Sequence, residues 1–167
     1  LAVFRHLLLC HEVPQKADDE TLLAAAAGLT AQIKSGNGEN ARSAAGLIRL
    51  FSSPDIPKRI CREYNDFLLE NHKIDFEDMI LRCRQLLETD PGTLACWRDR
   101  FRWILVDEFQ DVNPVQYRLV KAWAGQGANT FVIGDPDQAI YGFRGADYRF
   151  FWQLKEDYPV ARVCRLT

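Results

Sequence analysis

The chain has 167 residues, of which 47% are hydrophobic and 26% charged, as expected for a globular protein with a buried core. Its formal net charge of −2 excludes nucleic-acid binding through bulk positive charge, so any such binding must come from local patches. No apolar run approaches the ~18 residues of a bilayer span and the N-terminus does not fit a cleaved signal, so we expect a cytoplasmic protein with no membrane partner.

Residues 1–96 carry only helix signals and predict an all-helical subdomain. Acidic residues 18–20 precede an alanine-rich run that ends at the Ser-Gly-Asn-Gly of residues 35–38, which predicts a helix between them. A shorter helix is expected over residues 41–51. Pro57 suits the first turn of the next helix, and Asp75 is expected to cap a further helix over residues 76–87.

After Pro91-Gly92 the pattern changes to alternating strands and helices. Asn113-Pro114 predicts the start of a helix that runs to about Ala124, and a second helix is expected over residues 147–157. This order predicts an α/β fold whose parallel sheet has right-handed crossovers. The expected strands are residues 101–106, 129–133 and 160–166.

Two aromatic segments have a structural explanation. Residues 97–103 alternate aromatic and charged side chains, and at the entry to a strand this places arginines on one face and rings on the other. Part of the aromatic segment 148–152 is expected to pack against other residues.

Five cysteines are too widely spread to predict a disulfide framework or a zinc site. They form no Cys-x-x-Cys pair, and we favour free cysteines buried as small apolar residues over metal ligation near His6 and His11. The cysteines are Cys10, Cys61, Cys83, Cys96 and Cys164.

The first motif is the apolar strand Ile104-Leu105-Val106, which is followed by Asp107 and Glu108. At the carboxyl end of a strand in a parallel α/β sheet, such acids hold Mg²⁺ and activate water near a nucleotide phosphate. Taken alone, the two carboxylates would equally well cap the following turn.

The second motif covers residues 134–146 and changes from acidic to aromatic and basic. Its amide, Gln138, can donate to a phosphate oxygen and accept from a water molecule. Tyr141, Phe143 and Arg144 follow, and aromatic rings stack on unpaired bases with about 1–3 kcal/mol per base. The motif predicts a loop with two ligands, although the rings would also suit a protein core.

Together the motifs Asp-Glu-Phe-Gln-Asp and Gly-Asp-Pro-Asp-Gln-Ala-Ile-Tyr-Gly-Phe-Arg-Gly-Ala resemble the second and third conserved motifs of the UvrD/Rep-like DNA helicases of superfamily 1. Residues 74–80 resemble the helix start that precedes the second motif in that family. The resemblance covers residue 74 to the end of the chain. It implies a partial RecA-like parallel sheet in residues 97–167, with residues 1–96 as a helical accessory subdomain.

The resemblance also implies roles for single residues, with ATP and Mg²⁺ as cofactors. Asp107 would hold Mg²⁺ directly or through water, Glu108 would be the catalytic base, and Gln138 would sense the γ-phosphate. The family usually has Trp at the position of Phe143. Gln110, Asp111 and Asp135 would belong to the nucleotide pocket, and Tyr141, Phe143 and Arg144 would bind single-stranded DNA.

The implied function is ATP-dependent translocation on single-stranded DNA and duplex unwinding at single-strand/double-strand junctions, with 3′ to 5′ polarity, in DNA repair, replication or recombination. The family's Gly-x-x-x-x-Gly-Lys-[Ser/Thr] loop is missing, since the sequence contains no Gly-Lys pair. We therefore interpret the chain as an internal segment of a larger helicase, inactive without the remaining motor domains.

Three alternatives stay open at this point. The first is the motor of an AddA- or RecB-type helicase–nuclease. The second is a decayed, nucleotide-independent DNA-binding or scaffold module. The third is a metal-dependent phosphohydrolase that uses Asp107, Glu108 and Asp135, but it leaves the aromatic half of the second motif unexplained.

Overall fold

The computed structural model describes residues 19–34, 49, 53, 55–126 and 129–166. The chain divides into two compact units. One holds residues 1–82 and 143–145, and the other holds residues 83–142 and 146–167. The helix expected over residues 41–51 falls mostly on undescribed residues and is not tested, and the histidine and cysteine residues near the N-terminus lie outside the described ranges.

The described part of the first unit is mainly helical. It contains α2 (Asp19–Lys34), α4 (Asp55–Glu70) and the first half of α5 (Phe76–Thr89). α2 packs against α4. Their buried apolar side chains are Ala25, Ala26 and Leu29 on α2 and Ile60, Cys61 and Leu68 on α4.

A buried lysine joins α2 to the start of α5. The side chain of Lys34 is only 4% exposed, and its Nζ lies 2.6 Å from Asp75 Oδ2 and 3.0 Å from Asp78 Oδ1. Asp75 Oδ1 accepts a hydrogen bond of 2.8 Å from the backbone N–H of Asp78, so Asp75 caps α5 as predicted. Burial opposes the charged form of Asp75, but its bonds to Lys34 and Asp78 outweigh this and lower its pKa.

In the second unit, α6 (Pro91–Arg100) is a helix that the sequence patterns did not predict, since they indicated alternating strands and helices after Pro91-Gly92. Asp90 is the N-cap, and its Oδ1 accepts from the backbone N–H groups of Gly92 at 2.9 Å and Thr93 at 3.1 Å. Proline suits the first turn of a helix, because the N–H that it lacks has no partner there in any case.

The aromatic residues of segment 97–103 therefore begin on a helix and not at a strand entry. Trp97 and Phe101 lie four residues apart, and their rings stack with centroids 5.2 Å apart. Four residues is about one helical turn, so the helix places both rings on one side. The predicted separation of rings from arginines is wrong, since Arg100 lies 5.8 Å from both ring centroids.

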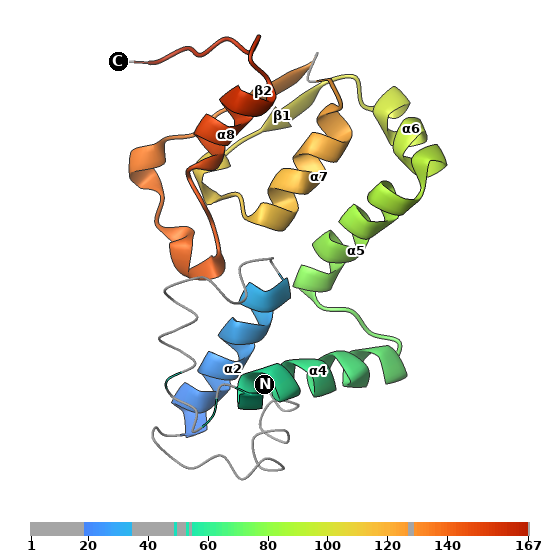
Figure 1. The fold of residues 1–167 in the computed structure, drawn as a ribbon, viewed down its shortest axis with the longest axis vertical. Coiled ribbons are helices and arrows are strands. Elements are labelled where there is room, and N and C mark those ends of the chain that lie inside the picture. Colours follow the sequence, from blue (N-terminus) through green and yellow to red (C-terminus); the bar gives the residue numbers. More distant parts are fainter. Residues whose placement is uncertain (1–18, 35–48, 50–52, 54, 127–128, 167) are drawn as a thin grey trace. The chain divides into compact units, whose positions relative to one another are not determined.

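The sheet of the second unit has two parallel strands, β1 (Ile104–Val106) and β2 (Thr130–Val132), paired in the register Ile104 to Thr130. In the sequence, α7 (Pro114–Ala124) connects the two strands. It begins with the predicted cap, because Asn113 and Gln116 form a capping box. α8 (Phe150–Asp157) follows β2, and Figure 1 shows α7 and α8 on the same side of the strands.

The core of this unit lies between the helices and one face of the sheet. Phe109 is fully buried, and with Val112, Tyr117 and Phe150 it forms a cluster against which the half-buried Val106 and Val132 pack. The opposite face of the strands is exposed. The register partners Leu105 and Phe131 point there and are 73% and 59% exposed.

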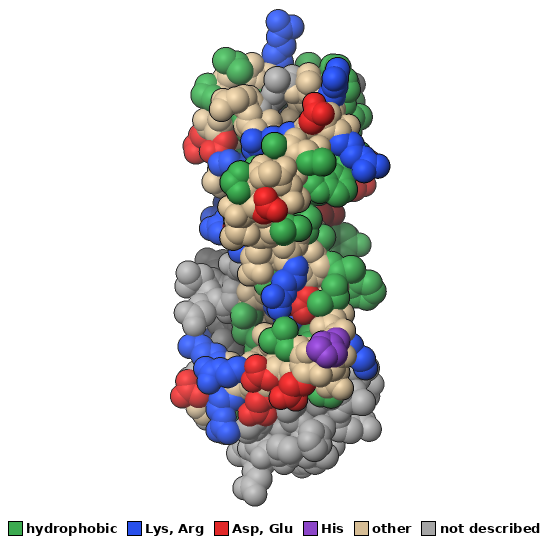
Figure 2. All heavy atoms as spheres, turned by 90° about the vertical axis from the view of Figure 1, so that its right-hand side faces the viewer, with side chains coloured by type: hydrophobic (Ala, Val, Ile, Leu, Met, Phe, Trp, Pro, Cys, Tyr) green, Lys and Arg blue, Asp and Glu red, His purple; other side chains and the backbone are tan. Residues whose placement is uncertain are grey.

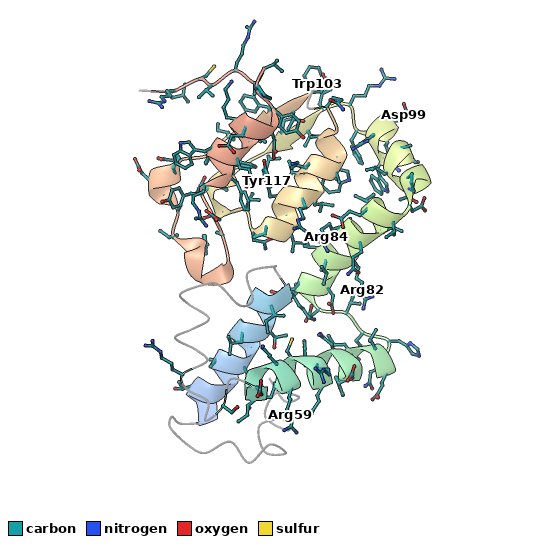
Figure 3. All side chains as sticks on the ribbon, in the orientation of Figure 1. Arg59, Arg82, Arg84, Asp99, Trp103 and Tyr117 are labelled. Atoms are coloured by element: carbon teal, nitrogen blue, oxygen red, sulfur yellow. The ribbon has the colours of Figure 1, made fainter. Side chains whose placement is uncertain are left out.

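Other apolar side chains also reach the surface. On the side of the molecule seen in Figure 2, hydrophobic side chains lie among Lys, Arg, Asp and Glu side chains. Trp103, at the entry to β1, is among the most exposed aromatic residues (Figure 3). Among the described residues, no helix has the length and hydrophobicity of a membrane span.

The strand expected over residues 160–166 is wrong. Residues 161–166 have no regular secondary structure, and Val160, Val163 and Leu166 are exposed. A short apolar run becomes a strand only where a neighbouring strand takes its backbone hydrogen bonds, and no such neighbour pairs with it in the described part of the chain. The class is nevertheless α/β, mostly helical with a small parallel sheet.

Two of the described cysteines also differ from expectation. Cys61 is buried and Cys83 half-buried, whereas Cys96 and Cys164 are exposed; all four are free. Burial is the largest influence on Cys61 and raises the pKa of its thiol.

Candidate functional site

The candidate site lies where β1 and β2 end side by side. Asp107 and Glu108 directly follow β1, and Gly134 and Asp135 follow β2 after the intervening Ile133. The pairing continues past the strands, because the backbone N–H of Phe109 donates to the Ile133 carbonyl at 3.0 Å. Ligands of α/β sheets bind beyond the carboxyl ends of the strands, which is this edge.

Glu108 has an unusual backbone. Its φ of 50° and ψ of 43° are left-handed, a conformation that costs a non-glycine residue about 1 kcal/mol. The turn is held by two hydrogen bonds of 2.9 Å: the Glu108 N–H donates to Asp107 Oδ1, and the Asp111 N–H donates to the Glu108 carbonyl. The strained turn keeps the carboxylates of Asp107 and Glu108 exposed at the strand end.

Gln110 bridges the two strand ends. It lies in the short 3₁₀ helix η1 (Phe109–Asp111) and is only 2% exposed. Its Nε2 donates to Glu108 Oε2 at 2.6 Å, and its Oε1 accepts from the Asp135 N–H at 3.0 Å. A buried amide with both ends bonded is well satisfied, and it fixes the loop after β1 to the loop after β2.

Gly134 makes room for this bridge, a role that the sequence did not reveal. A Cβ atom there would lie 2.3 Å from Gln110 Oε1, 2.8 Å from the backbone nitrogen of Phe109 and 3.0 Å from the Phe151 ring. No larger residue fits without moving the amide. The only available signal was a glycine directly after a predicted strand, which often marks close backbone approach.

Asp135 continues the network toward Gln138. It caps the 3₁₀ helix η2 (Pro136–Gln138), where its Oδ1 accepts from the Asp137 N–H at 3.0 Å. Its Oδ2 accepts from Gln138 Nε2 at 2.8 Å. The hydrogen bonds thus connect Glu108 to Gln138 through Gln110 and Asp135, and all four are site residues that the sequence indicated.

Asp111 bonds to Glu108 through its backbone N–H, but among the described residues no hydrogen bond links its side chain to this network. Its side chain is half-buried, and Oδ1 is a buried atom without a hydrogen-bond partner within the described residues. A buried carboxylate oxygen without a partner costs free energy, and a ligand or water molecule can supply the missing bond.

The predicted DNA-binding residues lie in the 3₁₀ helix η3 (Tyr141–Arg144). The Tyr141 side chain is exposed, and its carbonyl accepts from the Ala146 N–H at 3.3 Å. The side chains of Phe143 and Arg144 lie outside the described set. A connection between these residues and the Glu108–Gln138 network therefore stays a prediction.

Asp107 suits a magnesium ion that is shared with a nucleotide. One carboxylate oxygen accepts from the Glu108 N–H, which leaves the other for a ligand. The described residues contain no cluster of three or more His, Cys, Asp or Glu side chains that would cage a metal. Mg²⁺ commonly binds through one or two carboxylates, with phosphates and water completing the shell, so this donor set fits.

The sequence of the chain is similar to those of known proteins. A family model described as UvrD/REP helicase N-terminal domain matches residues 13–159. The chain is 43% identical over 104 residues to the ATP-dependent DNA helicase PcrA of Staphylococcus epidermidis, which is 62% of this chain and 14% of that protein. It is 39% identical over 109 residues to the YjcD protein of Bacillus subtilis, which is 65% of this chain and 14% of that protein. The chain therefore spans about one seventh of these relatives.

Proposed function

Because the chain belongs to the UvrD/REP helicase N-terminal domain family, we propose that the protein that carries it is an ATP-dependent DNA helicase. The observation that supports the proposal best is the network from Glu108 to Gln138 at the ends of two parallel strands. It joins a carboxylate that suits a base to an amide that suits a phosphate contact.

In the proposed reaction, Glu108 accepts a proton from the attacking water. The water oxygen forms a bond to the γ-phosphorus atom as the bond to the β–γ bridging oxygen breaks, and ADP leaves with that electron pair. Asp107 would hold Mg²⁺, which would neutralise phosphate charge when bound. Gln138 would donate to a γ-phosphate oxygen, while Gln110, Asp111 and Asp135 would support the pocket.

The finer parts of the proposal come from the resemblance. Residues 97–167 would be part of a RecA-like motor domain and residues 1–96 a helical accessory subdomain. Tyr141, Phe143 and Arg144 would bind single-stranded DNA near a junction with duplex DNA. The protein would be cytoplasmic and would move 3′ to 5′ along the strand. It would act in DNA repair, replication or recombination. Because Gln138 and Tyr141 are three residues apart, loss of the γ-phosphate contact would shift this loop.

The decayed, nucleotide-independent module is the second candidate. The hydrogen-bond network argues against this candidate. A buried amide such as Gln110 is costly unless it is fully hydrogen-bonded, and DNA binding alone does not require such a bridge. An AddA- or RecB-type helicase–nuclease stays within the proposed motor class. A nuclease domain in the same reading frame would identify it.

The deciding experiment measures ATP hydrolysis by the whole protein with and without single-stranded DNA. Wild type is compared with Glu108→Gln and with the control Glu156→Gln, which neutralises an exposed carboxylate on α8. We expect strand-stimulated turnover that falls about 100-fold or more in Glu108→Gln only. Strand binding without turnover in wild type would favour the decayed module instead.

A further inference from the structure

We infer that Gln110 is a positioning residue for Glu108, and that Gly134 is required because its missing side chain leaves room for the Gln110 amide. The inference rests on the proposed function and deepens it. It concerns how the catalytic carboxylate is held, which neither the family assignment nor the relatives' names address.

The first observation is the use of both ends of one amide. Gln110 Nε2 lies 2.6 Å from Glu108 Oε2, while Gln110 Oε1 accepts from the Asp135 N–H at 3.0 Å. The N–H of a backbone can only donate, so the bond to Asp135 fixes which end of the amide is oxygen. The NH₂ end must then face the Glu108 carboxylate.

The second observation is the mobility that Glu108 would otherwise have. Its side chain is exposed, and within the described part of the chain its carboxylate receives one hydrogen bond, from Gln110. Gln110 itself is almost fully buried and adjoins the fully buried Phe109. A rigid donor thus holds a flexible acceptor, and misplacement of a catalytic group by about 1 Å can cost ~100-fold in rate.

The third observation is steric. A Cβ at Gly134 would lie 2.3 Å from the same Gln110 oxygen that binds Asp135. Gly134 does not have a positive φ, so its lack of a side chain matters here for space and not for backbone conformation. An alanine would push the amide away from Asp135, and the NH₂ end would move away from Glu108.

The test uses Gln110→Met in the whole protein. Methionine keeps the length and buried volume of glutamine but cannot donate to a carboxylate. We expect kcat for ATP to fall about 100-fold while KM changes less than about threefold, since the base acts in the transition state. Gln153→Met, the same change at an exposed site on α8, should keep the wild-type kcat.

A double-mutant cycle distinguishes positioning from simple structural support. Glu108→Asp shortens the base, keeps measurable turnover and withdraws the carboxylate from Gln110. If Gln110 acts through Glu108, adding Gln110→Met to Glu108→Asp lowers kcat no further. An additive loss, or a Gln110→Met kcat within about twofold of wild type, overturns the inference.

Gly134→Ala is the second variant if Gln110→Met does not fold. The same fall in kcat with unchanged KM supports the inference, and a wild-type kcat overturns it. Different results would contradict the proposed function itself. These are a wild-type protein that does not hydrolyse ATP, or a Glu108→Gln variant that keeps full turnover, whatever the Gln110 variants do.

Discussion

The hydroxyl group of Tyr117 on α7 donates a hydrogen bond of 2.6 Å to Asp157 Oδ2 at the end of α8. Lys121, one turn further along α7, lies 2.8 Å from the same oxygen. Tyr117, labelled in Figure 3, belongs to the core cluster. Its ring stacks on that of Phe150 with centroids 4.4 Å apart. The hydrogen bond between Tyr117 and Asp157 therefore connects α7 to α8.

Tyr117→Phe should destabilise the chain by about 1 kcal/mol, because it removes one hydrogen bond to a partly exposed carboxylate and keeps the ring. Urea unfolding measures this change. Tyr148→Phe is the control, since Tyr148 is exposed and its ring contact with Trp152 does not need the hydroxyl. Equal effects of the two changes would show that the Asp157 bond contributes nothing.

The Asp157 contacts should also make stability depend on pH. Hydrogen bonds from Lys121 and then Tyr117 lower the pKa of Asp157 below its ordinary value. A carboxyl group whose pKa is lower when folded stabilises the protein above its unfolded pKa of about 3.9, and this contribution disappears as pH falls through the folded pKa.

Asp157→Asn tests that expectation. The loss of stability relative to wild type should be constant from about pH 5 to 7 and shrink below about pH 4. The free energy of unfolding is measured by urea titration at each pH. A difference that does not change with pH would mean that the charge of Asp157 is unimportant.

Lys34→Met should be strongly destabilising. The substitution leaves Asp75 and Asp78 without their cation. Removing one partner of a buried ion pair lowers the free energy of unfolding by about 3–5 kcal/mol. Lys73→Met, at an exposed position, should stay within about 0.5 kcal/mol of wild type. Thermal and urea unfolding both report the change.

Removing the two carboxylates as well should restore much of that loss. In the triple variant Lys34→Met, Asp75→Asn, Asp78→Asn no buried charge remains unpaired, and the asparagine that replaces Asp75 can still cap α5. A triple variant as unstable as Lys34→Met would mean that the lysine matters for packing and not for charge.

Gly134→Ala should destabilise by about 1–3 kcal/mol through overpacking, since the new Cβ meets both a side chain and a backbone atom. Gly142→Ala is a matched control, because among the described residues, its chain neighbours aside, no atom lies within 4 Å of a Cβ at Gly142. Its stability should stay within about 0.5 kcal/mol of wild type. Similar losses at both positions would contradict the steric explanation.

Local signals in the sequence predicted much of this fold. The Asn113-Pro114 start of α7 and the Asp75 cap of α5 depend only on neighbouring residues, and both are confirmed. The helix that starts at Pro91 was not predicted, because Pro-Gly can end one helix or start another. Asp90, which decides between the two, bonds to the backbone of Gly92 and Thr93.

The sequence indicated the candidate site residues, whose roles stay a prediction, but it did not indicate the hydrogen bonds between them. The carboxylates of Asp107 and Glu108 stand out directly after an apolar run. The bond between Gln110 and Asp135, however, joins residues 25 positions apart and exists only because β1 and β2 pair in parallel. The strand expected over residues 160–166 failed for a similar reason, since strand formation depends on partners that hydrophobicity alone does not identify.

Leu105 and Phe131, on the open face of the sheet, also affect how stability varies with temperature. The heat capacity of unfolding rises with the apolar surface that becomes newly hydrated, and these two side chains are largely hydrated before unfolding begins. Their hydration in the folded state should therefore make the heat-capacity change of unfolding slightly smaller than it would be if this face were covered. The stability curve then has slightly less curvature toward both heat and cold.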